Sequence, residues 1–183
     1  TMIPISIIIP AYNEEKSIAR AIKSATAQSL KNIEIIVVND ASTDKTAEIV
    51  KQIATTDNRV KLISHNKNMG LNQSRLTGLS IAQGEYIQFL DADDSLEKNA
   101  IEQLYSHAKS HNLDMVMMGC QHYHKYLKFY LLKKSRKDSE FYSKLHTLRM
   151  SIAMRLASGM SGGRKSNAKG TSVEFSDFRE YQL

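Results

Sequence analysis

The sequence predicts an α/β fold in which helices cover a mostly parallel sheet. Apolar, strand-sized runs alternate with amphipathic stretches from the amino terminus to about residue 118, and this alternation is typical of parallel sheets. The chain has 183 residues, 42% of them hydrophobic, which suits one domain with its own core. Polar clusters follow three of the apolar runs. Because ligands of open α/β sheets bind where the strands end, we expect one shared pocket at these clusters.

The predicted strands are short and rich in Ile, Val and Leu, the composition of strands that are buried on both faces. They span residues 5–9, 33–38, 60–63, 86–90 and 115–118. Pro10 is expected to end the first strand, because proline has no backbone N–H to donate to a neighbouring strand.

The predicted helices carry apolar residues at every third or fourth position. They cover residues 14–28, 45–53, 71–82 and 96–111. The apolar face of the first helix consists of Ile18, Ala21, Ile22 and Ala25. Asp44 and Asp94 are expected to cap the second and fourth helices, and Gly84 is expected to stop the third.

Three carboxylates lie within four residues, directly after the predicted strand 86–90: Asp91, Asp93 and Asp94. Carboxylates this close repel one another unless a cation or a set of hydrogen-bond donors offsets the repulsion. Oxygen ligands favour a hard ion such as Mg²⁺ or Mn²⁺. A helix cap would account for one of the acids but not for three, so the cluster indicates a metal or ligand site.

Positive charge is concentrated after residue 120. The net charge is +6, and residues 121–170 contain 12 Lys or Arg against 2 Asp or Glu. Residues 141–156 show the pattern of an amphipathic helix with a basic flank. We favour a helix that packs on the rest of the domain or on a homodimer partner. The alternative is a helix that makes peripheral contact with an anionic membrane.

Several classes of function do not fit the sequence. A Rossmann oxidoreductase would carry Gly-x-Gly-x-x-Gly after the first strand, and a P-loop NTPase would carry Gly-Lys-Ser/Thr; neither motif occurs. A protein that binds nucleic acid would leave the acidic cluster unexplained. Cys120 is the single cysteine and can form no disulfide within the chain, so we expect a cytoplasmic protein, with contact at the inner face of the membrane as the alternative.

Four motifs follow one another in order within residues 5–118. They are Ile7-Ile8-Ile9-Pro10-Ala11-Tyr12-Asn13-Glu14-Glu15, then Val37-Val38-Asn39-Asp40-Ala41-Ser42-Thr43-Asp44, then residues 66–70 with Arg75 and Gly78, and last Gly84-Glu85-Tyr86 leading into Leu90-Asp91-Ala92-Asp93-Asp94. This arrangement resembles the family 2 glycosyltransferases of the GT-A fold. The resemblance implies a Rossmann-like, nucleotide-sugar-binding core over residues 1–118 and a basic, helical, acceptor-side extension of the same domain over residues 119–183. Domains of this family commonly run longer, so we expect the extension to be incomplete.

The resemblance also implies roles for single residues. The donor nucleotide would be lined by residues of all the motifs: Pro10, Ala11, Tyr12, Glu14, Asp40, Arg75, Asp91 and Ala92. Asp40 would accept a hydrogen bond from the base, usually uracil. Asp93 would bind the divalent metal, and Asp91 would contact the ribose or support the metal. Without the resemblance, Asp40 could instead start an Asx turn and Arg75 could form a surface ion pair.

The activity implied is that of an inverting, Mn²⁺- or Mg²⁺-dependent hexosyltransferase in polysaccharide biosynthesis. It would move a sugar from a nucleoside diphosphate sugar, most often a UDP-sugar, to a glycan or lipid-linked acceptor. Inversion requires a general base. Glu174 and Asp177, which would share one face of a helix, are the candidates. No clear version of the family's base motif follows residue 120, so the rival is a catalytically inactive, nucleotide-sugar-binding subunit or scaffold.

Overall fold

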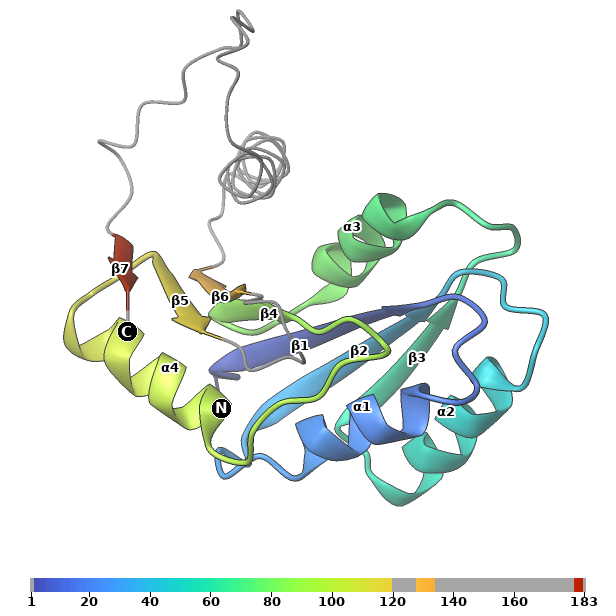
Figure 1. Ribbon diagram of the computed structural model, residues 1–183, viewed down its shortest axis with the longest axis horizontal. Helices are drawn as coiled ribbons and strands as arrows, with labels where there is room; N and C mark the ends of the chain where they lie inside the picture. Colours follow the sequence, from blue (N-terminus) through green and yellow to red (C-terminus); the bar gives the residue numbers. More distant parts are fainter. Residues whose placement is uncertain (1, 120–127, 134–179, 183) are drawn as a thin grey trace, which may run out of the picture. The chain divides into compact units, whose positions relative to one another are not determined.

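The computed structural model describes residues 2–119, 128–133 and 180–182. The strands are β1 (Ile5–Ala11), β2 (Ile33–Asn39), β3 (Val60–Ser64), β4 (Tyr86–Phe89), β5 (Met115–Gly119), β6 (Lys128–Lys133) and β7 (Glu180–Gln182). The helices are α1 (Ile18–Thr26), α2 (Thr46–Thr56), α3 (Leu71–Ile81) and α4 (Ala100–Ser110). The predicted alternation of strands and helices is confirmed over this part of the chain (Figure 1).

The strands form one sheet in the order β3-β2-β1-β4-β6-β5-β7. Neighbours among β3, β2, β1 and β4 are parallel, whereas β6 is antiparallel to both β4 and β5. The chain builds outward from β1 to β3 and then returns to place β4 on the other side of β1. The order of strands therefore reverses between β1 and β4, which is where open α/β sheets bind their ligands.

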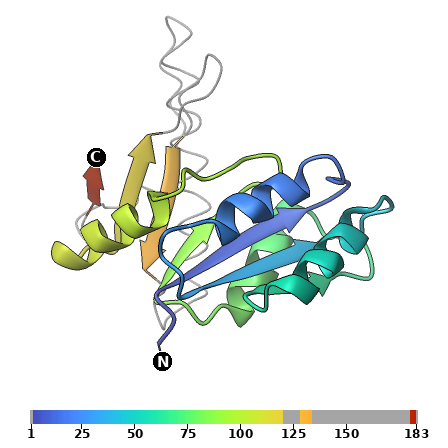
Figure 2. The ribbon, with the colours of Figure 1, turned by 90° about the horizontal axis from the view of Figure 1, so that it is seen from below.

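The core lies on both faces of the central strands. Every residue of β1 and β2 is buried, and α1 and α2 cover one face of these strands while α3 covers the other (Figures 1 and 2). α1 buries Ile18, Ala21, Ile22 and Ala25, which confirms the predicted apolar face. The two-sided cover explains why the strands are continuously apolar rather than alternating.

Pro10 does not end β1, contrary to the expectation from the sequence. Pairing of β1 with β4 stops at Ile8 opposite Phe89, but pairing with β2 continues through Pro10 to Ala11. Beyond Ile8 the strand therefore has a paired neighbour on one side only among the described residues. A proline is tolerated at such an edge-like position because the missing N–H costs no hydrogen bond.

Gly84 also has a different role from the predicted helix stop. α3 ends at Ile81, and the following Ala82 is already extended. A Cβ on Gly84 would lie 2.4 Å from the backbone nitrogen of Ser6, and the Gly84 N–H donates to Ser6 Oγ at 2.7 Å. The glycine is needed because the chain passes directly against β1.

The fourth helix begins later than predicted, at Ala100, so Asp94 does not cap it. The fully buried Gln28, just beyond α1, provides the cap instead: its Oε1 accepts the N–H of Ile101 at 3.0 Å, and its Nε2 donates to the Glu97 carbonyl at 2.8 Å. These two bonds hold the segment before α4 against α1. The Asp94 N–H donates to the Asp91 carbonyl at 3.0 Å, which closes a turn.

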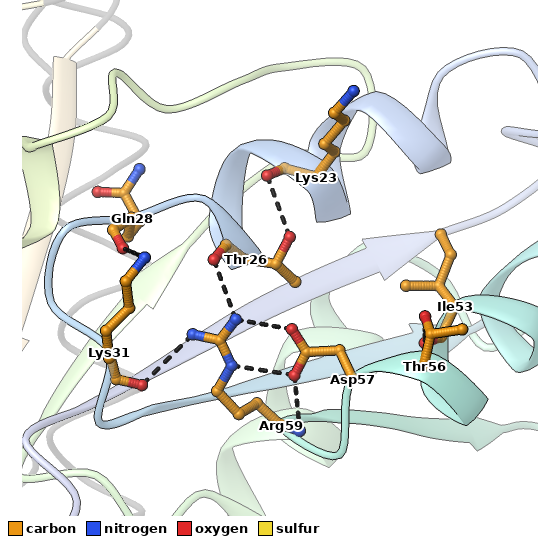
Figure 3. A network of polar contacts seen from close by, with 8 residues as sticks. All are labelled: Lys23, Thr26, Gln28, Lys31, Ile53, Thr56, Asp57 and Arg59. Carbon is orange, nitrogen blue, oxygen red and sulfur yellow. Dashed lines mark hydrogen bonds and ion pairs between the residues drawn. The ribbon is translucent and has the colours of Figure 1, made fainter.

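Two networks of hydrogen bonds connect neighbouring elements at the amino-terminal edge of the parallel strands. In the first, the Arg59 guanidinium lies between the Asp57 carboxylate and two main-chain carbonyls (Figure 3). Its Nη2 donates to Asp57 Oδ2 at 2.6 Å and to the carbonyl of Thr26, the last residue of α1, at 3.0 Å. Its Nη1 donates to the Lys31 carbonyl at 3.3 Å. One side chain thereby joins the ends of α1 and α2 to the start of β3.

The second network surrounds Glu34 in β2, whose side chain is 3% exposed. Its Oε1 accepts from Ser6 Oγ at 2.6 Å and from the Gln83 N–H, and its Oε2 accepts from Lys61 Nζ at 2.9 Å. Burial acts to raise the pKa of Glu34, but the hydrogen bonds from Ser6, Lys61 and Gln83 outweigh it and hold this pKa below its ordinary value. Glu34 is thus a buried, ionised carboxylate whose donors all come from the chain itself.

Some predictions fall elsewhere in the chain. The amphipathic helix at 141–156 and the base candidates Glu174 and Asp177 lie outside the described residues. β6 was not predicted, although its Phe129-Tyr130-Leu131-Leu132 run has the aromatic and apolar composition of a strand. Within the described ranges, no helix is long and apolar enough to cross a membrane.

Candidate functional site

The predicted polar clusters meet at the carboxyl-terminal edge of the parallel strands. Ala11 at the end of β1 lies opposite Asn39 at the end of β2 in the register, and the Asp40 N–H donates to the Ala11 carbonyl at 2.8 Å. β4 ends at the same edge on the other side of β1. The loops after β1, β2 and β4 therefore border one region, as the sequence predicted.

The loops after β1 and β2 are joined by reciprocal hydrogen bonds. The Asn13 N–H donates to Ser42 Oγ at 3.0 Å, and the Thr43 N–H donates back to Asn13 Oδ1 at 2.8 Å. Asn13 (φ 55) and Ala41 (φ 57) both adopt the left-handed conformation. For alanine this conformation costs about 1 kcal/mol, so the surrounding bonds must hold it in place.

Asp44 makes the second connection between these loops. Its Oδ1 accepts the N–H of Thr46, the first residue of α2, at 2.9 Å, and its Oδ2 accepts the N–H of Glu15 at 3.0 Å. Burial acts to raise the pKa of Asp44, but the bonds from Thr46 and the Glu15 amide outweigh it and lower that pKa. The predicted role of Asp44 as a cap of α2 is confirmed, although Asp44 lies one position before the N-cap residue, Lys45.

Thr46 extends this connection to Glu14. The Glu14 N–H donates to Thr46 Oγ1 at 2.8 Å, and the Glu14 carboxylate accepts from the Ser17 hydroxyl. The Glu14 amide therefore bonds to the first residue of α2, and the Glu15 amide bonds to the loop before it. α1 itself begins at Ile18 rather than at Glu14 as predicted.

Asp40 is buried directly after β2 and accepts three hydrogen bonds. Its Oδ1 accepts from His65 Nδ1 at 2.7 Å and from the Met69 N–H at 2.8 Å. Its Oδ2 accepts from the Gly70 N–H at 2.7 Å. Burial acts to raise the pKa of Asp40, but the bonds from His65 and from the two amides outweigh it and keep this pKa below the ordinary value. Asp40 is therefore an ionised acceptor at the edge of the site.

The Asx-type turn that was the alternative for Asp40 belongs to its neighbour. Asn39 Oδ1 accepts the N–H of Ser42 at 3.2 Å, whereas the Asp40 carboxylate bonds to the segment 65–70 instead. Asp40 thus links β2 to the start of α3.

Arg75 from α3 forms an ion pair within the site. Its Nη2 donates to Asp91 Oδ1 at 2.7 Å, and its guanidinium carbon lies 5.8 Å from the centroid of the Phe89 ring. The Arg75 side chain is 12% exposed, against 40% for Asp91. Arg75 therefore does form an ion pair, but its side chain is largely buried and its partner is an acid of the predicted cluster, so the pair lies within the site rather than on the surface.

Asp93 is held through its main chain. Arg20 Nη2, from α1, donates to the Asp93 carbonyl at 2.6 Å. Asp93 is exposed, and no side chain in the described residues donates to its carboxylate at hydrogen-bond distance. The turn is thus anchored while one carboxylate stays accessible, which suits a group that meets a ligand.

The acids fit a divalent ion that is bound together with a ligand. In the described part of the chain, no group of three or more His, Cys, Asp or Glu gathers to form a complete cage. Mg²⁺ is commonly bound by one or two carboxylates and the phosphates of a substrate. Asp93 and the half-exposed Asp91 could supply such carboxylates.

Four residues at this edge have structural roles that sequence reasoning missed: Asn13, Arg20, His65 and Thr77. His65 directly precedes the motif at 66–70, so its position was a usable signal. Thr77 Oγ1 lies 2.9 Å from His65 Nε2. Arg20 carries no signal, since an exposed arginine on a helix is ordinary.

Comparison with known proteins gives a consistent result. The family described as "Glycosyl transferase family 2" matches residues 6–170. Glycosyltransferase GlyG of Streptococcus pneumoniae is 36% identical over 119 residues, which cover 65% of this chain and 40% of that protein. The chain thus spans well under half the length of this relative.

Two solved structures share the fold. Staphylococcus aureus TarS in complex with UDP-GlcNAc matches with a TM-score of 0.61 and 29% identity, over 64% of this chain and 34% of that one. Mannosyltransferase PcManGT of Pyrobaculum calidifontis, in complex with GDP-Man and Mn²⁺, matches with a TM-score of 0.57 and 25% identity, over 61% of this chain and 34% of that one.

Proposed function

The chain belongs to glycosyl transferase family 2, and we propose that it transfers a sugar from a UDP-sugar to a glycan or lipid-linked acceptor. The observation that carries the proposal is the meeting of two kinds of acid at one edge of the sheet. Asp40 is buried and ionised beside β1, and Asp93 is exposed after β4. The first suits recognition of a neutral base, and the second suits a metal-bound diphosphate.

The donor side is supported by residues of the first two loops. Pro10 and Ala11 are buried at the end of β1, while Tyr12 is 48% exposed, so its ring is available to a base or ribose. The hydrogen bonds between the loops hold these residues before a ligand arrives, which lowers the entropy lost on binding. TarS, with which this chain shares its fold, binds UDP-GlcNAc.

Asp93 would hold a Mn²⁺ or Mg²⁺ ion, with Asp91 supporting it or contacting the ribose. Such an ion, when bound, stabilises the negative charge that develops on a departing diphosphate. Arg75 holds Asp91 by an ion pair at 2.7 Å and would keep this carboxylate in one orientation. PcManGT, a second protein of shared fold, was solved with Mn²⁺.

The transfer would proceed with inversion by a single displacement. A carboxylate would then remove the proton of the acceptor hydroxyl on the side opposite the leaving group. Glu174 and Asp177 remain the candidates for this base. With a lipid-linked acceptor, the protein would work at the inner face of the membrane. A homodimer stays a prediction from the sequence.

Binding and turnover measurements on the full chain test the proposal. Calorimetry with UDP, with and without Mn²⁺, is expected to show metal-dependent binding. A panel of UDP-sugars is then screened for Mn²⁺-dependent donor hydrolysis and transfer. Binding without any turnover would favour the rival, an inactive nucleotide-sugar-binding subunit or scaffold. If UDP does not bind in either condition, both functions are wrong.

A further inference from the structure

We propose that His65 and Thr77 are positioning residues that hold Asp40 as a selective acceptor for bases carrying a ring N–H. This inference rests on the proposed function, because it concerns the base of the donor nucleotide. Asp40, His65 and Thr77 form one continuous chain of hydrogen bonds, at 2.7 Å and 2.9 Å, from the end of β2 to α3. The side chains of His65 and Asp40 are 13% and 5% exposed.

The hydrogen-bond capacity of Asp40 leaves one defined position open. An ionised carboxylate has about four acceptor sites, two on each oxygen. Oδ1 accepts two bonds, from His65 Nδ1 and the Met69 N–H. Oδ2 accepts one bond from the described residues, that of the Gly70 N–H. One further acceptor site therefore remains, and it belongs to Oδ2.

The donor and acceptor in each hydrogen bond between Asp40, His65 and Thr77 follow from the ionised state of Asp40. An ionised Asp40 can only accept, so the hydrogen between it and His65 is on Nδ1. In the neutral imidazole Nε2 is then an acceptor, and the Thr77 hydroxyl donates to it. This tautomer keeps Asp40 supplied with a donor and leaves no lone pair of His65 directed at the carboxylate.

The support beneath Thr77 is rigid because α3 packs directly on the sheet. A Cβ on Gly78 would lie 2.4 Å from Ile8 Cγ2 and 3.3 Å from Val38 Cγ2. The backbone of α3 at Gly78 therefore lies directly against the side chains of Ile8 and Val38, and this close packing resists a shift of the helix along or toward the sheet. The Gly70 amide at the start of the same helix also bonds to Asp40. The carboxylate is thus held from the start of α3 by the Gly70 amide and, through His65, from Thr77 in the middle of the helix.

A fixed acceptor discriminates between bases by their ring nitrogens. Uracil N3 carries a hydrogen and can donate to the open site of Oδ2. Cytosine N3 carries only a lone pair, which would leave a buried carboxylate position unpaired and facing another acceptor. Sites that require a hydrogen bond reject analogues that lack it far more strongly than apolar pockets reject a size change. A carboxylate free to rotate would lose part of this selectivity.

Equilibrium binding of UDP and CDP to the full chain, with Mn²⁺ present, tests the role. We expect wild type to prefer UDP. His65→Leu should lower the UDP/CDP affinity ratio by about tenfold or more, and Thr77→Val by about threefold, since the imidazole would then be held at one end only. His65→Gln can donate to Asp40 and accept from Thr77, so it should restore part of the ratio. Thr55→Val, whose hydroxyl bonds within α2 at the Gln52 carbonyl, should change nothing.

A second measurement does not depend on nucleotide. The ¹⁵N shifts of the His65 ring are expected to show the Nδ1–H tautomer in wild type and a change in Thr77→Val. A UDP/CDP ratio unmoved in both His65→Leu and Thr77→Val overturns the positioning role, as does equal binding of UDP and CDP by wild type. If wild type binds neither nucleotide, the proposed function fails instead, and this outcome is distinct from the others.

Discussion

The two edges of the parallel sheet treat acidic side chains in opposite ways. At the amino-terminal edge, donors from the chain itself bind both Glu34 and Asp57. Asp57 is bound in bidentate fashion by Arg59, as Figure 3 shows. At the carboxyl-terminal edge, Asp93 is exposed, and Asp91 is paired with Arg75 and 40% exposed. Acids with internal partners stabilise a fold, whereas acids left accessible remain available to a ligand. The first edge holds the structure and the second is open for chemistry.

Asp40 lies between these extremes. It belongs to the carboxyl-terminal edge, but its three internal donors resemble those of Glu34. Its place distinguishes it from Glu34, whose oxygens accept the same number of bonds: Asp40 directly follows β2 at the carboxyl-terminal edge, beside the loops of the site. The comparison therefore predicts that a substitution at Asp93 affects function alone, a substitution at Glu34 affects stability alone, and a substitution at Asp40 affects both.

The largest effect is expected for Asp93→Asn. Loss of the carboxylate should reduce Mn²⁺-dependent donor turnover about 1,000-fold, because several kcal/mol of charge stabilisation at the diphosphate would be lost. The thermal midpoint should stay near that of wild type, since no described side chain bonds to this carboxylate. Steady-state kinetics with a UDP-sugar and thermal unfolding measure the two quantities.

Glu97→Gln is the matched control for Asp93→Asn, because Glu97 is an exposed acid four positions further along. It should alter neither turnover nor stability. Unchanged turnover in Asp93→Asn would show that the assigned metal role is wrong. A large loss of stability in that variant would contradict the division between the two edges.

The next largest effect is expected for Glu34→Gln, in stability. The variant should lose about 2 kcal/mol of unfolding free energy, because hydrogen bonds to a buried charge are replaced by weaker ones. Lys61 adds little to this figure, since its side chain is 45% exposed. Urea unfolding measures the loss, and UDP affinity should be unchanged.

The same variant should alter the dependence of stability on pH. The pKa of Glu34 is lower in the folded chain than its ordinary value of 4.5. Its stabilisation is therefore complete above that value and is lost as the pH falls through the lower folded value. The difference in unfolding free energy between wild type and Glu34→Gln should shrink as the pH falls below 4.5. A constant difference down to the acid transition would contradict an ionised Glu34.

A smaller effect is expected for Arg59→Lys, about 1 kcal/mol of unfolding free energy. Lysine keeps the charge but cannot bond to Asp57 in bidentate fashion while also reaching the carbonyls of Thr26 and Lys31. Chemical denaturation measures the loss. The reverse exchange Lys51→Arg, at an exposed position of α2, serves as control and should be neutral. An equal change in both variants would mean that the geometry of the Arg59 fork is unimportant.

The smallest effect is expected for Asp44→Asn, whose side-chain oxygen can still accept one of the two amides. A loss of a few tenths of a kcal/mol in stability is expected, since asparagine is as good a helix cap as aspartate. UDP affinity should fall more than stability, because the Glu15 amide then loses its partner in the first loop. Calorimetry and denaturation on the same samples compare the two. Equal losses of stability and of UDP affinity, expressed as free energies, would mean that Asp44 has a structural role like that of Glu34.

The parts of the fold that could be predicted were those that depend on the local amino-acid composition. The β-branched runs of β1 and β2, buried along their whole length, and the acids that follow β4 were visible without a structure. The boundaries that were wrong depend on distant partners. Gln28 caps α4 from 73 positions away, so no local signal could move the start of that helix to Ala100. The role of Gly84 likewise depends on the backbone of Ser6, which only the folded sheet brings near.

The site shows the same division. Asp40 could be chosen because it directly follows a buried strand, where ligands gather. Asp93 could be chosen because it belongs to the acidic cluster after β4 and matches the family's motif. The position of His65 before the motif at 66–70 was a usable signal, but its pairing with Thr77 could not be predicted, because these hydrogen bonds join segments that only the fold brings together. An ion pair of Arg75 was considered from the sequence, but its partner, Asp91, was not identified. Residues that touch a ligand leave a pattern in the sequence more readily than residues that hold them.

The reciprocal bonds between the loops after β1 and β2 have a consequence for protein engineering and for evolution. Asn13 needs Ser42 and Thr43, and Glu15 needs Asp44. An exchange of one loop with that of a relative would break bonds that its own residues cannot replace, however well the new loop suits a different donor. The two loops are expected to be inherited and transplanted as one unit, and chimeras that carry both should fold where chimeras that carry one do not.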